Sequence, residues 1–452
     1  LMLALVVYFS PLGKIRIGGE GAKPLLSKIK WFSVTLCTTL AVGALFWTTA
    51  EPIFHLNRPP FSLGLEPGSA DAALFSMSAL LLHWSFTPYA IYAVPALVFA
   101  LVFYNRKLPF SIGSSLQPVF GDAVLGKKGQ IIDTVALYAL VVGMASSLGT
   151  GAITLVGGVG EFTGVSATPF ALGVAISVIV ATFIVSAASG LHKGIARLSA
   201  LNAWLLAFLG LFVFVFGPTA FILAIGTEGL GTYLNNFFQL SLFTGAASGD
   251  PWPQQWSVFN WAVWFAWAPI STLFLGKIGR GYTVREFIQV NLFFPALLAI
   301  VWIAIFSGTA IHIDLTGGGI LNATLNDQGI EKLLYFVFRQ LPLSEIMTLV
   351  LIFVAFISYV TAADSNTDAI GNLCTSGFNA DSDEKAGLGF KVLWGSIIGI
   401  VSWVMVSFIG IDGIKMLSNL GGLPAAIMIL ASSLTLCKWL HQPDLLKRQG
   451  PL

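Results

Sequence analysis

Long apolar runs separated by short polar segments dominate the pattern of this chain. Ten runs approach or exceed the ~20 residues that a helix needs to cross about 30 Å of hydrocarbon. They cover about 31–49, 73–104, 131–157, 168–190, 199–225, 257–276, 288–311, 345–370, 392–411 and 419–438. The runs have helix length and lack the ten-residue alternation of membrane β-strands. The pattern therefore predicts an all-α protein that crosses a membrane many times.

The composition excludes most soluble classes of protein. Of the 452 residues, 56% are hydrophobic and only 10% are charged, whereas soluble domains carry about 25% charged residues. This apolar content is too large for one water-soluble core, which excludes a cytosolic enzyme, a nucleic-acid-binding protein and a disordered protein. The three cysteines and five histidines are scattered singly, which disfavours a disulfide framework, a zinc site or a haem.

The positive charges alternate between the two sides of the predicted spans. Nineteen of the 23 Lys and Arg residues lie on one side, and only Arg58, Lys332, Arg339 and Lys415 lie on the other. Because positive charge marks the cytoplasmic side, we expect both ends of this chain in the cytoplasm and the protein in the cell (inner) membrane. Residues 1–30 are interpreted as the remnant of a preceding transmembrane helix and its cytoplasmic loop.

Two outer loops contain amphipathic stretches, at 233–243 and 329–340. Apolar and polar residues alternate in them at helical spacing. They are interpreted either as helices that lie on the membrane surface, in contact with lipid, or as loop helices packed on the spans. The sequence favours neither interpretation.

Aromatic side chains concentrate in the second and sixth runs. Trp84, Tyr89 and Tyr92 fall within one arc of a helix, and so do Trp264 and Trp267 together with a further Trp one turn earlier. Two such faces can enclose a quaternary ammonium group, which has no N–H to donate and is held by cation–π attraction. The alternative is an interfacial aromatic belt, and composition alone favours that alternative.

Small and hydroxyl-bearing residues mark three further spans. Small residues at the centre of the first run and at 146–151 in the third allow either helix unwinding beside a cavity or close helix packing. In the eighth run, Ser358 and Thr361 lie on one stripe with a further Ser one turn later. These hydroxyls suit a hard cation such as Na⁺, or they bond back to carbonyls four residues earlier. Asp364, near the end of that run, is a candidate proton carrier.

Several segments together resemble the betaine/choline/carnitine transporter family. They occur in family order and cover nearly the whole chain. The segments are HWSFTPYAIYAV (83–94), SGLHKGIARLSALN (189–202), FGPT (216–219), NWAVWFAWAP (260–269), GRGYTVREF (279–287) and TAADS (361–365).

The resemblance implies an all-α polytopic fold with LeuT-type inverted five-helix repeats. The first repeat would cover 31–225 and the second 257–438. An extracellular loop with a surface helix (226–256) would join them, and a short cytoplasmic tail (439–452) would follow. The first helix of the family is missing from this chain. The resemblance also implies a homotrimer.

The family's aromatic box carries over onto Trp84, Tyr89, Tyr92, Trp264 and Trp267. Tyr89 stands where the family usually has Trp, and Val263 replaces another usual Trp. The resemblance therefore implies a box with fewer indole faces than the family norm.

The first run departs further from the family. Sodium-coupled betaine members usually have Gly-Met-Gly-Ile-Gly where this chain has Thr39-Leu40-Ala41-Val42-Gly43. Thr39, Leu40 and Ala41 are thus expected to contact the substrate with side chains where the family has closer backbone contact. Glycine betaine itself does not follow from this pattern.

The sodium site departs as well. Thr361 keeps the first of the family's two adjacent hydroxyls, and Ala362 lacks the second. Ser358 or a water molecule would have to replace the lost oxygen. We therefore expect a weak Na⁺ site at Thr361 and Ser358, with a proton or solute exchange as rival drivers and no other cofactor.

The sequence thus predicts a secondary transporter of a small quaternary-ammonium or related onium or zwitterionic solute that works by alternating access. An exchanger of the same fold is the alternative. A membrane enzyme subunit would need paired intramembrane histidines or several buried acids, and a channel would need a repeated filter or charged ring. We find neither pattern in the sequence.

Overall fold

The computed structural model describes residues 1–40, 43–188, 192–374 and 387–446. Across these residues the fold is helical, with a single isolated β-bridge between Arg16 and Thr283. The long helices are α2 (Lys28–Leu40), α3 (Gly43–Asn57), α4 (Ala70–Trp84), α5 (Phe86–Ala100), α8 (Lys127–Thr163), α9 (Pro169–Ala188), α10 (His192–Phe216), α11 (Thr219–Asn235), α13 (Phe259–Ile278), α15 (Phe294–Thr316), α18 (Ser344–Leu373), α19 (Leu388–Phe408) and α20 (Ile411–His441).

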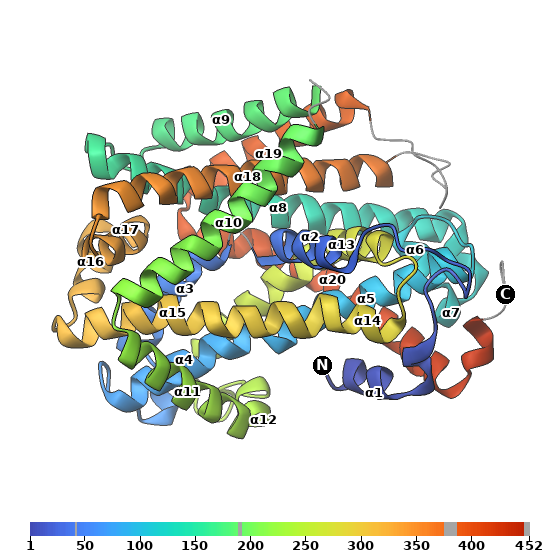
Figure 1. The fold of residues 1–452 in the computed structure, drawn as a ribbon, viewed down its shortest axis with the longest axis horizontal. Helices are drawn as coiled ribbons and strands as arrows, with labels where there is room; N and C mark the ends of the chain where they lie inside the picture. Colours follow the sequence, from blue (N-terminus) through green and yellow to red (C-terminus); the bar gives the residue numbers. More distant parts are fainter. Residues whose placement is uncertain (41–42, 189–191, 375–386, 447–452) are drawn as a thin grey trace.

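Short helices connect the long ones. They are α1 (Met2–Phe9), α6 (Ile112–Ser115), α7 (Gln117–Phe120), α12 (Phe237–Ser241), α14 (Val284–Ile288), α16 (Ile320–Gln328) and α17 (Leu333–Arg339), with single turns η1 (Pro11–Lys14), η2 (Phe61–Leu63), η3 (Leu101–Asn105), η4 (Asp122–Leu125), η5 (Gln254–Val258), η6 (Gln289–Phe293), η7 (Ile330–Lys332) and η8 (Pro443–Leu446). Figure 1 shows α16 and α17 at one end of the molecule and α6, α7 and the C-terminus at the other.

Seven described helical segments are long and apolar enough to cross a membrane, and an eighth results if one bent pair counts as a span. The seven are Ala70–Asn105, Lys127–Thr163, Gln254–Ile278, Val284–Thr316, Ser344–Asp364, Leu388–Phe408 and Ile411–His441. The first predicted run contains residues 41 and 42, which lie outside the described residues, and the apolar part of α9, Pro169–Val185, is short. All-α architecture is confirmed, while the count of ten spans stays a prediction.

The predicted span 199–225 is not one continuous helix. Helix α10 ends at Phe216, and α11 leaves it at an angle of 107°. Gly217 and Pro218 lie at the bend, and a proline has no N–H to continue the helical hydrogen bonds. The expected boundary at 225/226 therefore falls inside α11, and the expected surface helix 233–243 is the end of α11 followed by α12.

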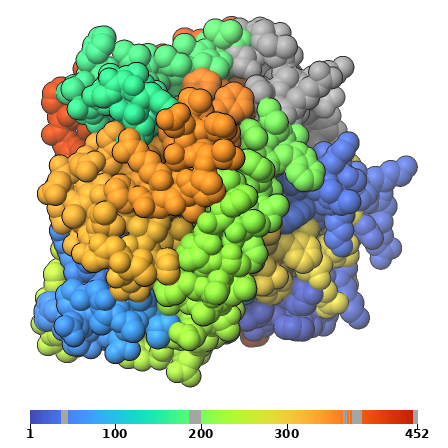
Figure 2. Space-filling view, turned by 60° about the vertical axis from the view of Figure 1, so that its left-hand side comes forward, coloured from blue at the N-terminus to red at the C-terminus, as the bar shows by residue number. Residues whose placement is uncertain are grey.

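The second amphipathic stretch packs on the spans. Helix α17 buries Tyr335, whose hydroxyl donates to the carbonyl of Thr154 on α8 (2.7 Å). A Cβ added at Gly158 of α8 would approach that same hydroxyl. The alternative interpretation of 329–340, a loop helix packed on the spans, is thus correct. Figure 2 shows this end of the molecule, with the orange segment beside the green α10.

The second predicted run is interrupted at Ser85. Helix α4 ends at Trp84 and α5 begins at Phe86, and the Ser85 backbone adopts φ −113° and ψ −119°. Pro88 lacks the N–H that would bond to the carbonyl of Trp84 in a continuous helix. This break in the helical backbone lies within the aromatic motif, although Ala70–Asn105 still forms one span-length segment.

Glycines bring α8, α13 and α20 into close contact. A Cβ added at Gly422 of α20 would lie 2.6 Å from the Cα atom of Ala262 on α13. A Cβ at Gly421 would lie 2.6 Å from the side chain of Val142 on α8. Such approach is the usual way in which membrane helices gain van der Waals contact. Within the predicted small-residue patch at 146–151, a Cβ added at Gly151 would lie 2.6 Å from the ring of Tyr359 on α18, which supports close packing at that glycine.

The GRGYTVREF segment holds the N-terminal part of the chain. Tyr282 stacks on Trp31 with ring centroids 4.1 Å apart, and its carbonyl accepts the N–H of Ile17 (2.9 Å). Thr283 and Glu286 form a capping box at the start of α14. This motif therefore stabilises a loop at the end of the molecule opposite α16 and α17.

Replacing Gly422 with Ala should lower the stability of the protein. The added methyl must displace the backbone of α13, and overpacking of this kind costs about 1–3 kcal/mol. The matched control is Gly389→Ala on α19, because nothing lies within 4 Å of a Cβ at Gly389. Thermal unfolding in detergent should show a lower apparent Tm for the first variant only. Equal Tm values for the two variants would contradict the close contact.

Candidate functional site

A small cavity of about 90 Å³ lies where α3, α4 and α5 meet α8, α13, α18 and α20. Six aromatic residues and three hydroxyl residues line it, together with small or aliphatic ones. The lining residues are Gly43, Trp47, Trp84, Tyr92, Ser146, Ser147, Thr150, Phe259, Val263, Trp264, Trp267, Ala362 and Ile414. No charged side chain belongs to this set.

The predicted aromatic box converges on Trp264. Its ring centroid lies 5.6 Å from that of Trp84 and 5.0 Å from that of Tyr92. Trp267 lines the same cavity and also a smaller one beside Tyr359. Tyr89 is buried against Trp264 at 5.8 Å but is not among the lining residues. Four of the five box residues thus share one cavity, and Tyr89 supports them from behind.

Hydrogen bonds fix the orientation of two indole rings. The Trp84 Nε1–H donates to Glu51 Oε2 (2.8 Å), and the Trp264 Nε1–H donates to the carbonyl oxygen of His83 (2.9 Å). A buried indole N–H needs such a partner. Because both N–H groups are used in this way, the rings meet the cavity with their carbon frameworks.

A buried polar cluster lies behind Trp84. Glu51 Oε1 lies 2.6 Å from His83 Nδ1 and 3.2 Å from His55 Nε2, and all three side chains are fully buried. Asn260 Nδ2 on α13 also donates to Glu51 Oε1 (3.4 Å). The prediction that the histidines are isolated is therefore wrong, because the fold brings two of them onto one carboxylate.

The cluster could have been found in part from the sequence. Glu51 and His55 are four residues apart, so they share one face of a helix that is otherwise apolar. An acid and a histidine on one such face indicate a buried polar pair. His83 lies 32 residues away from Glu51, and only the packing of α4 on α3 reveals that contact.

The hydroxyls of the candidate sodium site bond within the protein. Thr361 Oγ1 donates to the carbonyl of Ile357 (2.8 Å), and the buried Ser358 Oγ accepts from Asn202 Nδ2 (2.8 Å). Ala362 lines the cavity with a methyl group. The back-bonding alternative thus applies to Thr361 in this conformation. A role for Thr361 and Ser358 in Na⁺ binding stays a prediction.

Asp364 is buried and paired. Its Oδ1 lies 3.1 Å from Lys391 Nζ of α19, and both side chains are nearly inaccessible to solvent. The Asp364 carboxylate thus already has a buried ionic partner within the described part of the chain. This pairing disfavours Asp364 as the carrier of a transported proton.

The remaining predicted contacts cannot be placed. Ala41 and the side chains of Thr39 and Leu40 lie outside the described residues, so their contact with substrate stays a prediction. Gly43, which follows them, lines the cavity, and a Cβ there would lie 3.2 Å from the Trp84 ring. The first span therefore reaches the aromatic box at least at Gly43.

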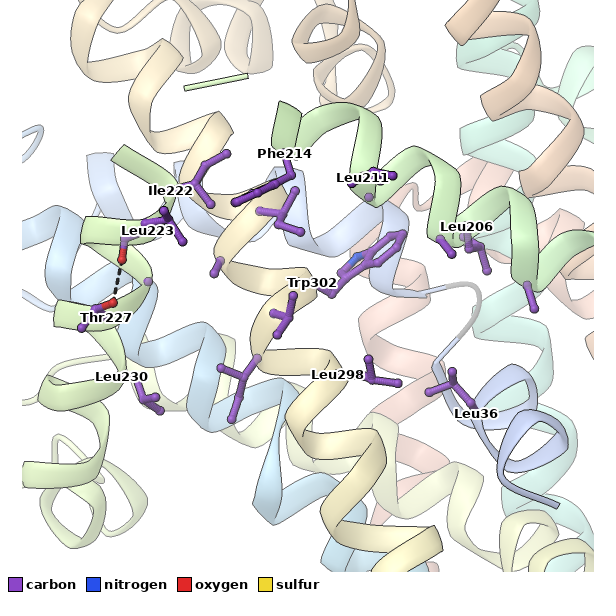
Figure 3. Close-up of a pocket in the computed structure, with 18 residues that line it drawn as sticks. Leu36, Leu206, Leu211, Phe214, Ile222, Leu223, Thr227, Leu230, Leu298 and Trp302 are labelled. Carbon is purple, nitrogen blue, oxygen red and sulfur yellow. Dashed lines mark hydrogen bonds between the residues drawn. The ribbon is translucent and has the colours of Figure 1, made fainter. Parts of the chain in front are cut away.

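A larger groove of about 680 Å³ lies between α10, α11 and α15 (Figure 3). Trp302, Phe214 and aliphatic side chains line most of it, and the hydroxyl of Thr227 donates to the carbonyl of Leu223 (2.7 Å). Its walls offer neither charge nor a free hydroxyl to a polar solute. Size alone therefore does not identify the site, and the smaller aromatic cavity is the better candidate.

Comparisons with known proteins cover almost the whole chain. A model of the betaine/carnitine/choline family of transporters matches residues 1–444. A probable glycine betaine transporter of Desulfitobacterium hafniense (strain Y51) is 31% identical over 431 residues, which are 95% of this chain and 84% of that protein. The glycine betaine transporter OpuD of Bacillus subtilis (strain 168) is 32% identical over 432 residues, with 94% and 81% covered.

Further similarities extend to choline transport and to solved structures. The osmo-independent choline transporter BetT1 of Acinetobacter baylyi is 30% identical over 439 residues, which are 96% of this chain and 82% of that protein. The crystal structure of MhsT in complex with L-phenylalanine has a TM-score of 0.52 at 13% identity and covers 94% of this chain and all of that one. This similarity concerns the fold alone and confirms the predicted LeuT-type architecture.

Since the family model spans nearly every residue and relatives at 30% identity or more cover the chain from end to end, the chain belongs to the betaine/carnitine/choline family of secondary active transporters.

Proposed function

We propose that the protein carries a small onium solute, such as betaine, choline, carnitine or a sulfonium analogue, across the cell membrane by alternating access. The observation that carries this proposal is the cavity formed by Trp84, Tyr92, Trp264 and Trp267. The names of the relatives, which transport glycine betaine or choline, support it. The bound solute undergoes no covalent change.

The chemistry of the cavity favours an onium group over an ammonium group. A primary ammonium needs hydrogen-bond acceptors, whereas a quaternary ammonium has no N–H and is attracted by the negative faces of aromatic rings. No carboxylate lines the cavity in the described part of the chain, and the nearby Glu51 is already bound to Trp84. The aromatic faces are thus the main attraction available to a cation.

The hydroxyls of α8 suit the other end of a zwitterion. Ser146 donates to the carbonyl of Ile414 (3.1 Å), and Thr150 donates to the carbonyl of Ser146 (3.3 Å). Ser147 lines the cavity, and its hydroxyl makes no hydrogen bond within the part of the chain that the structure describes. We propose that Ser147 donates to the carboxylate of a zwitterionic solute.

Transport would couple two halves of the fold. We propose that the helices of the first, second, sixth and seventh predicted runs move as a bundle against the others around the cavity. The two inverted repeats would cover 31–225 and 257–438. We also propose that both ends of the chain lie in the cytoplasm, that the protein contacts membrane lipid and that it assembles as a trimer. The Lys and Arg distribution supports the orientation, and family membership supports the trimer.

Replacing Trp264 with Leu should weaken onium binding. The change keeps an apolar side chain and removes the π face, so affinity should fall by about 0.5–2 kcal/mol. The measurement is a titration of glycine betaine and choline by calorimetry. Trp204→Leu is the matched control, because Trp204 is 76% exposed on α10 and lies away from the cavity. Loss of affinity in both variants, or in neither, would contradict the proposal that aromatic faces bind the onium group.

Replacing Ser147 with Ala should separate zwitterions from cations. A hydrogen bond to a charged group contributes about 1.5–3 kcal/mol, so glycine betaine affinity should fall by at least about tenfold. Choline has no carboxylate, and its affinity should stay within about twofold. An equal loss for both solutes would show that Ser147 shapes the cavity rather than binding the carboxylate.

We propose that Na⁺ coupling is weak or absent, because Ala362 offers no oxygen and Thr361 bonds back to its own helix. Uptake into proteoliposomes should then respond more to a pH gradient or to internal unlabelled solute than to a Na⁺ gradient, each imposed alone. Ala362→Ser restores the missing hydroxyl and should increase the response to Na⁺. Steep Na⁺ dependence of the unaltered protein at low millimolar concentrations would contradict this.

A further inference from the structure

The Glu51 carboxylate has a complete set of hydrogen-bond donors. Oε2 accepts from Trp84, and Oε1 accepts from His83, His55 and Asn260. Donors of this kind favour the ionised carboxylate. The cluster therefore has a fixed negative charge, and any change of charge must occur on one of its two imidazoles.

His55 is held in its neutral form. Its Nδ1 lies 3.3 Å from the Trp252 Nε1–H, which can only donate, so Nδ1 must be the unprotonated acceptor. Its one proton is then on Nε2 and points to Glu51. A second proton on His55 would face the Trp252 N–H and break this hydrogen bond.

His83 can gain a proton without losing a hydrogen bond. Its Nδ1–H donates to Glu51 (2.6 Å), and its Nε2 lies 3.1 Å from the hydroxyl of Ser257. A hydroxyl both donates and accepts, so Ser257 donates to neutral His83 and accepts from protonated His83 after a rotation. The side-chain amide of Asn260 also lies near His83 Nδ1. Its N–H groups donate to the Trp256 carbonyl and to Glu51, so they do not require an unprotonated Nδ1 on His83.

Few other charges face this cluster. On α20, Lys415 interacts electrostatically with Glu51 and His55, and Asp412 with Lys415. Asp250 accepts the backbone N–H of Trp252 on the far side of His55. The residues of η5 and α13 that touch the cluster, Ser257 and Asn260, are neutral. Protonation of His83 therefore adds one positive charge to the Glu51–His83 pair, whose net charge rises from −1 to zero.

That charge would lie close to the aromatic cavity. Trp84 separates Glu51 from the cavity by the width of one indole ring, and the carbonyl of His83 holds the Trp264 ring. Across a single ring, at an effective dielectric constant of about 20, a change of one charge alters the affinity for a cation by roughly tenfold or more. Such coupling is reciprocal, so a bound cation must also promote release of the proton.

We propose that Glu51, His83 and Ser257 form a proton-binding site whose occupation opposes onium binding in the aromatic cavity. The inference rests on the proposed function, because the onium solute is the competing ligand. Because a bound proton weakens solute binding, the coupling favours exchange of a proton for the solute over joint binding of the two. The proton site is thus an alternative to both the Thr361 sodium site and Asp364 as the source of ion coupling.

The spacing of the donor atoms fits a proton better than a metal ion. One ligand atom from each of Glu51, His55 and His83 lies within 4.8 Å of the others. The 2.6 Å separation of His83 Nδ1 and Glu51 Oε1 is a direct hydrogen bond. An ion with bonds of about 2.0–2.1 Å to both atoms would hold them further apart.

The test is a calorimetric titration of the purified full chain with choline and with glycine betaine between about pH 5 and 8, where histidine changes charge. Choline affinity should be roughly tenfold weaker at the acid end. Runs in two buffers of different ionisation enthalpy should show up to one proton released for each choline bound. His83→Gln keeps a donor for Glu51 and should remove both effects, whereas the matched control His55→Gln should keep the pH dependence.

A second variant tests the same proposal if His83→Gln does not fold. Ser257→Val removes the hydroxyl that accepts from protonated His83, so the affinity loss should move to lower pH. Affinity that is independent of pH in the unaltered protein, or pH dependence that persists in His83→Gln, overturns the proton site and leaves the proposed function standing. Loss of pH dependence with EDTA would assign the cluster to a metal and also overturn it. Failure of both solutes to bind at any pH overturns the proposed function and this inference together.

Discussion

One buried carboxylate organises the centre of this protein. Glu51 on α3 accepts hydrogen bonds from α4 through His83 and Trp84 and from α13 through Asn260. A buried charge that loses a partner costs several kcal/mol, so the three helices must keep their mutual register. Because Trp84 is a donor to Glu51 and the His83 carbonyl holds Trp264, the same register orients the aromatic rings.

The helices around this centre combine interruption with close contact. The second span breaks at Ser85, next to Trp84 of the cavity lining. Such irregular backbone is tolerated at membrane depth only where it lines a cavity or is buried in protein. By contrast, α8 and α20 are continuous helices, and α20 packs on α13 and α8 through Gly422 and Gly421. The fold thus combines one interrupted helix beside the cavity with closely packed continuous ones.

Much of the candidate site was predictable because its chemistry is local. In a continuous helix Trp84 and Tyr92 would share one face, and Trp264 and Trp267 do so on α13, so periodicity alone predicts two aromatic surfaces. Whether those surfaces meet depends on tertiary packing, and Tyr89, which has the same periodicity, lies behind Trp264 instead of lining the cavity. The Glu51–His83 contact escaped prediction for the same reason, since it joins residues 32 positions apart on separate helices. The bend after Phe216 was also missed, because the apolar run continues through Gly217 and Pro218 into α11.

The sequence by itself determined the helical, membrane-spanning class, because apolar runs of sufficient length have no other stable arrangement in lipid. Its motifs also determined the family. Only the tertiary structure decided which residues share the cavity, which histidines meet the buried acid, and that Asp364 is paired with Lys391. The physical reason is that hydrophobicity acts through each residue's own surface, whereas hydrogen bonds and ion pairs depend on the relative positions of side chains from different helices. Helix packing sets those positions, and small residues such as Gly421 and Gly422 set that packing to within the size of a methyl group.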